Sequence, residues 1–282
     1  MSEFIKVPVE SILSNDELSI LTKILNIKPI KIALDNGGFI AGGFARALLR
    51  KDPIRTYLSS YKEFNPGDID IFFRHKDHAD TTVAQLGKDF YSSQGGFAKE
   101  GTSGLVFDAS DLRDGALQHF MIQIVDSPGL ILPTVEETLL QFDFVNCQVA
   151  LVGGDLVYPR EWHELEDKML LKISNINAPF MGTRVNKYLR QRGYKGLVPE
   201  SQEIFQDWLI KAATSDFEGF NDKHKAGLEY AVKSLFANGV VLKESLVLFL
   251  GKWKEARASG SYSTQASYEI DWAQQAIQQS VS

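Results

Sequence analysis

Two short motifs, met in this order along the chain, constrain its fold more than any other feature. The first is a glycine pair, Gly42-Gly43, which follows the apolar run 39–41 and precedes a helix-forming stretch. The second is an acidic–apolar alternation that contains Asp68 and Asp70 and ends in an apolar run. The glycines predict a tight turn from a strand into a helix, and the alternation predicts a strand with a buried face.

Asp68 and Asp70 have the spacing that projects two carboxylates from one face of a strand, because strand side chains alternate with a period of two. Ile69 and Ile71 then point into the core, and Gly67 is expected to let a substrate or metal approach the backbone. Carboxylate oxygens are the hard ligands that Mg²⁺ prefers. The pair therefore predicts a Mg²⁺ site, which Mn²⁺ is also able to occupy.

The glycine turn predicts a site for phosphate groups. A helix that begins after glycines offers backbone N–H groups and a favourable dipole to an anion. Gly42 and Gly43 precede a helix expected over 44–50, and Arg46 lies in its first turn, where a guanidinium can pair with a phosphate. A triphosphate held here would lie close to a metal held by the aspartates.

Together, the run Gly42-Gly43-Phe44-Ala45-Arg46 and the run Gly67-Asp68-Ile69-Asp70-Ile71 resemble the motifs of the DNA polymerase β-like nucleotidyltransferase superfamily. The resemblance covers roughly residues 30–160. It implies that the double glycine binds the triphosphate of an NTP and that the aspartates bind Mg²⁺. The implied reaction transfers a nucleoside monophosphate to a hydroxyl acceptor, such as an RNA or tRNA 3′ end, a protein or a small molecule.

The sequence departs from the family's pattern at two positions. The spacing from Gly42 to Arg46 is similar to that of tRNA 3′-end and poly(A) adding enzymes, but Ala47 stands where their pattern has aspartate, which argues against that subfamily. The family also takes a third carboxylate from a neighbouring strand, where this chain has Gln123.

Two aspartates further along the chain are candidates for the missing third carboxylate. Asp143 is favoured over Asp126 as the third metal ligand and catalytic carboxylate, because it lies between two aromatic residues at the expected start of a core strand. If neither binds metal, the alternative is a catalytically impaired relative that binds a nucleotide or RNA as a sensor or interaction protein.

The chain is expected to form an α+β fold, in which a nucleotidyltransferase-type mixed sheet with flanking helices is followed by an all-helical lobe. The catalytic domain is predicted over 1–160 and the helical domain over 161–282, with a flexible link near 258–267. Residues 51–66 have no clear period and predict a loop. The other expected strands are 103–107, 119–125, and a hairpin of 144–152 with 156–158; the other expected helices are 77–91, 134–141, 161–171, 180–192, 201–213, 223–237 and 243–257.

The helical domain contains the densest basic stretch of the chain. Arg184, Lys187 and Tyr188 fall on one helical face at i, i+3 and i+4, so they predict contacts to an acceptor or a base through charge and stacking. His75 and His78, with Asp77 and Asp80 nearby, carry metal-ligand chemistry, but no cysteine is close and the stretch is expected to be an exposed helix start, so zinc is not expected.

Net charge, cysteine content and hydropathy limit the partners and the cellular location expected for this protein. The 282 residues carry a formal net charge of −6, which argues against a general polyanion-binding surface. Cys147 is the only cysteine, so no intrachain disulfide forms. No apolar run reaches the length of a membrane span, and the start MSEFIKVPVE lacks the pattern of a secretory signal, so a cytoplasmic location is expected.

Overall fold

The computed structural model describes residues 3–59, 67–86, 102–108, 119–176, 181–214 and 222–258. The chain separates into two compact units, Met1–Trp162 and His163–Ser282. The predicted boundary at residue 160 lies close to this division. The predicted link near 258–267 falls almost wholly outside the described residues, so it stays a prediction.

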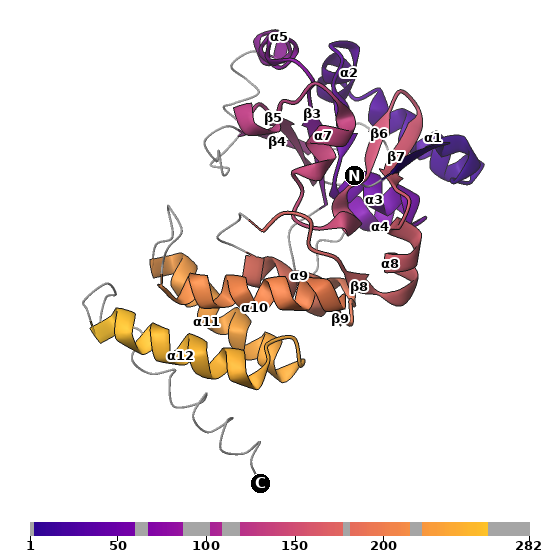
Figure 1. The fold of residues 1–282 in the computed structure, drawn as a ribbon. Coiled ribbons are helices and arrows are strands. Elements are labelled where there is room, and N and C mark those ends of the chain that lie inside the picture. The colour runs from indigo at the N-terminus through magenta and orange to yellow at the C-terminus, as the bar shows by residue number, and fades with distance from the viewer. Residues whose placement is uncertain are drawn as a thin grey trace. The chain divides into compact units, whose positions relative to one another are not determined.

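The first unit contains a seven-stranded sheet in the order β1-β7-β6-β2-β3-β5-β4 (Figure 1). Only β3 and β5 run parallel among the paired strands of this sheet that the structure describes. The strands are β1 (Phe4–Pro8), β2 (Phe39–Ala41), β3 (Asp68–Phe72), β4 (Thr102–Asp108), β5 (His119–Val125), β6 (Ala150–Val152) and β7 (Asp155–Pro159).

Helices cover both faces of this sheet. One face packs Ile40, Ile69, Ile71 and Ile124 against apolar residues of α1, α2, α3, α4 and α5, and the other packs Phe39 and Phe72 against α7. The helices and short 3-10 turns of this unit are η1 (Val9–Ser11), α1 (Asn15–Leu25), α2 (Lys28–Asp35), α3 (Gly43–Leu49), α4 (Ile54–Ser59), α5 (Lys76–Leu86), η3 (Pro128–Leu130), α7 (Val135–Leu140), η4 (Val145–Cys147) and α8 (Trp162–Lys168), which begins at the boundary.

The second unit is helical apart from a two-stranded parallel sheet. Its elements are β8 (Leu170–Leu171), α9 (Met181–Arg192), β9 (Gly196–Leu197), α10 (Pro199–Thr214), α11 (Asp222–Ala237) and α12 (Lys243–Ala258). Close packing at Gly182 brings α9 against α10 and α11, because a Cβ there would lie 2.9 Å from a methyl group of Leu228 and 3.1 Å from the ring of Trp208. The α+β class and the helical second part were both predicted correctly. No helix in the described part of the chain combines the length and apolar character that a membrane span requires.

The predicted loop over 51–66 was wrong in its first part. Residues 54–59 form α4, and Ile54, Tyr57 and Leu58 bury an apolar face at i, i+3 and i+4. Pro53, just before the helix, is compatible with a helix start, since a first-turn N–H has no intrahelical acceptor. The remaining residues of the predicted loop, 60–66, lie outside the described residues.

The N-terminus of α4 is held by a carboxylate from α1. Ser14 caps α1, since its hydroxyl accepts a hydrogen bond from the N–H of Glu17 at 3.3 Å. Glu17 turns to another helix, because its carboxylate accepts a hydrogen bond from the N–H of Ile54 at 3.1 Å. One of the first-turn donors of α4 is thereby satisfied.

The predicted strand over 144–152 was also wrong in its first half. Residues 145–147 form η4, and the strand begins only at Ala150. The buried indole N–H of Trp162 donates to the carbonyl oxygen of Asn146 at 3.0 Å, which stabilises the turn in place of a sheet contact. The hairpin was correct, since Gly153 and Gly154 adopt φ of +57° and +93° between β6 and β7.

We expect Glu17→Ala to loosen α4, because the N–H of Ile54 loses its acceptor. The local stability of α4 should fall by about 1 kcal/mol, the usual effect of removing a capping side chain. Hydrogen–deuterium exchange of residues 54–59 measures this, with the exposed Glu10→Ala in η1 as the matched control. Equal exchange in both variants would show that Glu17 does not anchor α4.

Candidate nucleotide-binding site

The two predicted metal carboxylates lie on one strand and one face. Asp68 and Asp70 are partly buried at the start and middle of β3, whereas Ile69 and Ile71 between them are fully buried in the opposite core. Phe72, next in the same alternation, packs against the α7 side. Both aspartates therefore project to the face that α7 covers further along the strand.

The glycine turn lies directly beside this pair. Strand β2 runs antiparallel to β3 with Ala41 opposite Asp70, so the chain leaves β2 toward Asp68. A Cβ built on Gly42 would lie 3.9 Å from Asp70 Oδ2, and one built on Gly43 would lie 3.8 Å from Asp68 Oδ1. The two sequence motifs thus form one site.

Gly42 is required by its backbone conformation. Its φ of +84° and ψ of −132° belong to a region that residues with a side chain rarely adopt. Its N–H donates to the carbonyl oxygen of Val149 at 2.9 Å, so it already has an acceptor. The donors suited to a phosphate are instead those of the first turn of α3, which have no acceptor within a helix.

Arg46 lies in the same short helix but is only 4% exposed. The sequence predicted a guanidinium in the first turn that reaches a phosphate. In the structure, Arg46 is the fourth residue of α3 and its side chain is buried, so its contact with a phosphate stays a prediction.

The register of the sheet shows what stands in place of a third carboxylate. Strand β5 pairs with β3 in parallel, and Gln123 lies level with Asp70, as the sequence indicated. Asp126 follows the last residue of β5 and lies about 10 Å beyond Gln123, at roughly 3.3 Å per residue. Asp126 is therefore not level with Asp70, and its role as a metal ligand stays a prediction.

Asp143 remains the other candidate. It lies in a bend between α7 and η4 rather than at a strand start, which corrects the sequence prediction. Its neighbour Phe142 packs on Phe72 with ring centroids 5.4 Å apart and lies 3.4 Å from the position of a Cβ on Gly42. Within the described residues, however, no three His, Cys, Asp or Glu side chains are grouped as a metal site. The role of Asp143 therefore stays a prediction.

Tyr57 belongs to the site although the sequence did not indicate it. Its hydroxyl lies 3.2 Å from the backbone oxygen of Asp68 and 3.4 Å from Asp68 Oδ1. A Cβ on Gly43 would lie 2.5 Å from this hydroxyl, and one on Gly67 would lie 2.5 Å from the tyrosine ring. Gly67 thus makes room for Tyr57 rather than for the substrate or metal that the sequence suggested. The apolar i, i+3, i+4 spacing of α4 was the available signal.

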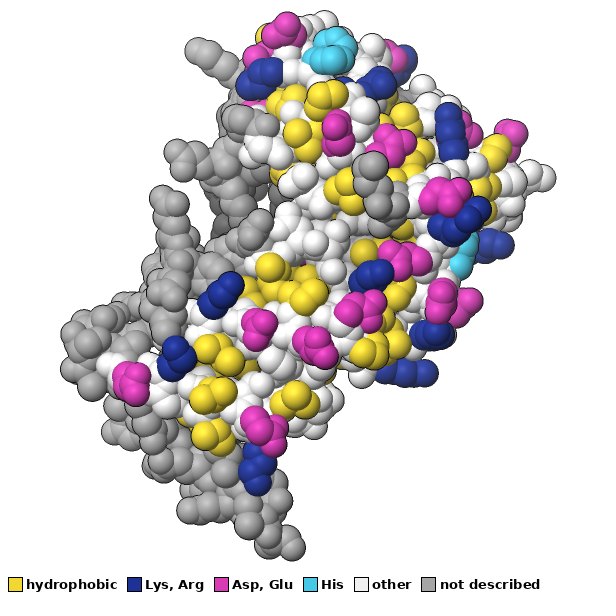
Figure 2. All heavy atoms as spheres, in the orientation of Figure 1, with side chains coloured by type: hydrophobic (Ala, Val, Ile, Leu, Met, Phe, Trp, Pro, Cys, Tyr) yellow, Lys and Arg dark blue, Asp and Glu magenta, His cyan; other side chains and the backbone are white. Residues whose placement is uncertain are grey.

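The predicted acceptor residues lie in the second unit, whereas Asp68 and Asp70 lie in the first. Arg184 and Lys187 are exposed on α9, while Tyr188 packs edge-on against Tyr194 with ring centroids 5.7 Å apart. On the face drawn in Figure 2, basic and acidic side chains are interspersed. This distribution agrees with the net charge of −6 in giving no sign of a broad polyanion surface on that face.

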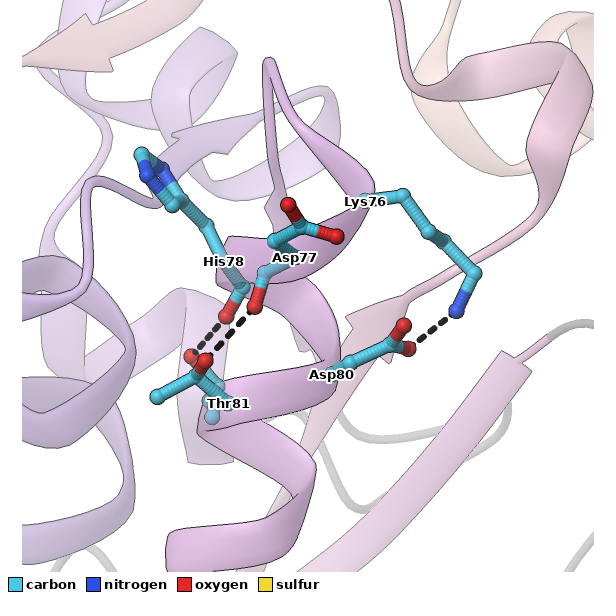
Figure 3. A network of polar contacts seen from close by, with 6 residues as sticks. Lys76, Asp77, His78, Asp80 and Thr81 are labelled. Atoms are coloured by element: carbon cyan, nitrogen blue, oxygen red, sulfur yellow. Dashed lines mark hydrogen bonds and ion pairs between the residues drawn. The ribbon is translucent and has the colours of Figure 1, made fainter.

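The histidines and aspartates near the start of α5 take part in local helix contacts. Asp80 pairs with Lys76 one turn before it, and the imidazole of His78 points away from Asp80 (Figure 3). The backbone oxygen of Asp77 accepts from the Thr81 hydroxyl at 2.7 Å. These contacts show that Asp77 and Asp80 interact with neighbouring residues of α5. The expected absence of zinc stays a prediction.

Comparisons with solved structures support the fold class. A CCA-adding enzyme with ATP matches at 15% identity and a TM-score of 0.53, covering 87% of this chain and 56% of the other. A tRNA-processing enzyme with CTP matches at 13% identity and a TM-score of 0.49, covering 79% and 56%. The Bacillus stearothermophilus CCA-adding enzyme in complex with CTP matches at 15% and 0.45, covering 80% and 51%.

The TM-score of 0.53 indicates a shared fold, whereas the two lower scores do not by themselves indicate one. The chain spans about half the length of these structures. It therefore has a nucleotidyltransferase-like fold, with a mixed sheet and a helical part.

The model of the Gabija anti-defense 2 family matches residues 11–168, more than half of the chain. The protein belongs to this family. The matched segment contains the glycine turn, α4 and the aspartate strand. Among curated proteins, no sequence matches the chain.

The contact between Gly43 and Tyr57 gives a sharp prediction. We expect Gly43→Ala to destabilise the first unit by roughly 1–3 kcal/mol, as overpacking does, because the new methyl group would meet the tyrosine hydroxyl. Combining it with Tyr57→Phe should recover most of that loss, since the ring carbon Cζ lies 3.6 Å from the same position, an ordinary contact.

Urea denaturation of the two single variants and the double variant forms the cycle that measures this coupling. Additive losses would contradict the packing described here. Gly129→Ala serves as the control, because a Cβ at Gly129 would meet no atom within 4 Å.

Proposed function

We propose that this protein is a Mg²⁺-dependent nucleotidyltransferase that moves a nucleoside monophosphate from an NTP to a hydroxyl acceptor. One observation carries the proposal. The pairing of β2 with β3 brings Gly42-Gly43 to within 4 Å of the carboxylates of both Asp68 and Asp70, measured from Cβ positions. A glycine turn beside two hard oxygen ligands suits a metal-bound triphosphate.

The residues of the site fit Mg²⁺ in kind. Asp68 and Asp70 would hold it, and when bound it neutralises phosphate charge and orients the leaving group. Neither a cysteine nor a histidine stands beside them on β3, as expected for a hard cation. The first-turn N–H groups of α3, with Arg46 behind them, would bind the triphosphate.

In the proposed reaction, the acceptor oxygen bonds to the α-phosphorus and the bond from that phosphorus to the β-phosphate bridge oxygen breaks. Pyrophosphate leaves, and the acceptor's proton passes to a carboxylate, for which Asp143 is the proposed candidate outside β3. Catalysis of this kind depends on position and charge rather than on covalent chemistry by side chains.

The acceptor is proposed to bind with help from the helical unit. Arg184 and Lys187 are exposed cations on α9 and suit phosphate groups of RNA or tRNA, and Tyr188 adds a ring suited to base stacking. Proteins and small molecules with a hydroxyl group are the other acceptor classes. The solved structure with a shared fold is described as a CCA-adding enzyme with ATP, which supports testing ATP first.

The family's description supplies the biological setting that we propose. Members are described by action against Gabija, so the transferase activity would serve to counter that defence. Expression of the intact chain should relieve Gabija defence in a host that carries it. The Asp70→Asn variant should fail to do so at equal protein abundance.

Transfer is tested directly with labelled NTPs, Mg²⁺ or Mn²⁺, and RNA, tRNA, protein and small-molecule acceptors. Asp70→Asn should lower the transfer rate by about 10²-fold or more, because charge stabilisation at the phosphate is lost. The matched control is Asp77→Asn, an exposed aspartate in the first turn of α5. If the Asp70→Asn variant transfers nucleotide at the wild-type rate, the proposal is wrong.

A second function is favoured by one specific observation, the neutral Gln123 level with Asp70. A site with two carboxylates could bind a nucleotide or RNA as a sensor or interaction protein without turnover. This alternative predicts binding that survives Asp68→Asn and Asp70→Asn and needs no Mg²⁺. Titration calorimetry with and without Mg²⁺ separates the two functions: metal-dependent binding supports the enzyme, and metal-independent binding supports the alternative.

A further inference from the structure

The hydroxyl of Tyr57 stands where the glycine turn and the aspartate strand meet. It lies 3.2 Å from the backbone oxygen of Asp68 and 3.4 Å from its Oδ1. A hydroxyl carries one proton, which these two acceptors share. The same hydroxyl is 2.5 Å from the position that a Cβ of Gly43 would take. Three features of the proposed site therefore converge on one phenol group.

Packing holds this phenol in place. Tyr57 is 7% exposed, and its ring packs edge-on against Phe44 with centroids 5.8 Å apart. Gly67 lies directly against the ring, where any side chain would clash. Helix α4, which carries Tyr57, is in turn tied to α1 through Glu17 and Ile54. The hydroxyl is thus presented to Asp68 by a buried and anchored side chain.

We propose that Tyr57 is a positioning residue for Asp68, an inference that rests on the proposed function. By donating to Oδ1 of the carboxylate, the hydroxyl restricts its rotation and so holds the carboxylate in one orientation for a metal ion. Partners that orient metal ligands in this way typically change metal affinity or activity by about 10–100-fold when removed. Tyr57 itself touches neither metal nor substrate in this role.

A purely structural role has a different signature. If the hydroxyl served only to tie α4 to the backbone oxygen of Asp68, its removal would lower thermal stability and leave metal binding unchanged. Tyr57→Phe distinguishes the two roles, because it keeps the ring packing and removes only the hydroxyl. Tyr158→Phe is the matched control: Tyr158 is also buried in the first unit, on β7, and packs on Trp162.

Equilibrium dialysis of the full chain against Mn²⁺, with the four α,β-methylene NTP analogues present, measures metal retention without turnover. We expect Tyr57→Phe to weaken Mn²⁺ retention about 10–100-fold, with Tyr158→Phe equal to wild type. Thermal melts run in parallel identify any variant that fails to fold. In the Asp68→Asn background, Tyr57→Phe should have no further effect, because the oriented ligand is already gone.

Unchanged Mn²⁺ affinity in Tyr57→Phe, with Asp68→Asn still weakening retention, would overturn this inference and leave the proposed function standing. A further loss in the Asp68→Asn background would also overturn it, since Tyr57 would then act elsewhere. If the wild-type chain retains no Mn²⁺, the metal site and the proposed function fail together, and the role of Tyr57 fails with them.

Discussion

The antiparallel pairing of β2 with β3 is the constraint on which the rest of the site depends. It fixes Ala41 opposite Asp70, so the turn that follows β2 lies beside the carboxylates instead of elsewhere on the sheet edge. A slip of one residue would turn Asp68 and Asp70 into the isoleucine core, because strand side chains alternate. The fully buried Ile69 and Ile71 oppose that slip, so the apolar core determines where the polar site lies.

Each glycine of the site has a packing or backbone reason that is independent of any ligand. Gly42 has a positive φ, Gly43 lies against the Tyr57 hydroxyl, and Gly67 lies against the Tyr57 ring. A glycine motif of this kind therefore indicates close packing at a turn in the first place, and a phosphate site only in the second. The functional interpretation rests on a further fact: the same corner places two partly buried carboxylates, those of Asp68 and Asp70, directly beside the glycine turn.

The parts of the fold that follow from local pattern were predictable. Alternation predicted β3, the pair Gly153-Gly154 predicted the hairpin, and helical pattern predicted most helices of the second unit. The apolar spacing of α4 could have indicated that Tyr57 is buried, but its contact with Asp68 was not predictable, because that contact arises from the tertiary packing of α4 across Gly67 onto β3. The turn at Asn146 was missed for the same reason, since the indole of Trp162, distant in sequence, stabilises it. The ends of helices and strands are set by tertiary contacts wherever these contacts oppose the local helix or strand propensity.

The neutral amide at Gln123 changes the electrostatics of the site as well as its ligand count. Two carboxylates attract a bare divalent ion less strongly than three do, but they also repel a triphosphate less. If the proposed function holds, a site of this charge would favour a metal that arrives already bound to nucleotide, because the phosphate oxygens would supply further ligands. Orientation of the two carboxylates on β3 then matters more, since β5 offers an amide rather than a carboxylate at the level of Asp70. A buried hydroxyl held against Asp68 is the kind of contact that such a reduced site requires.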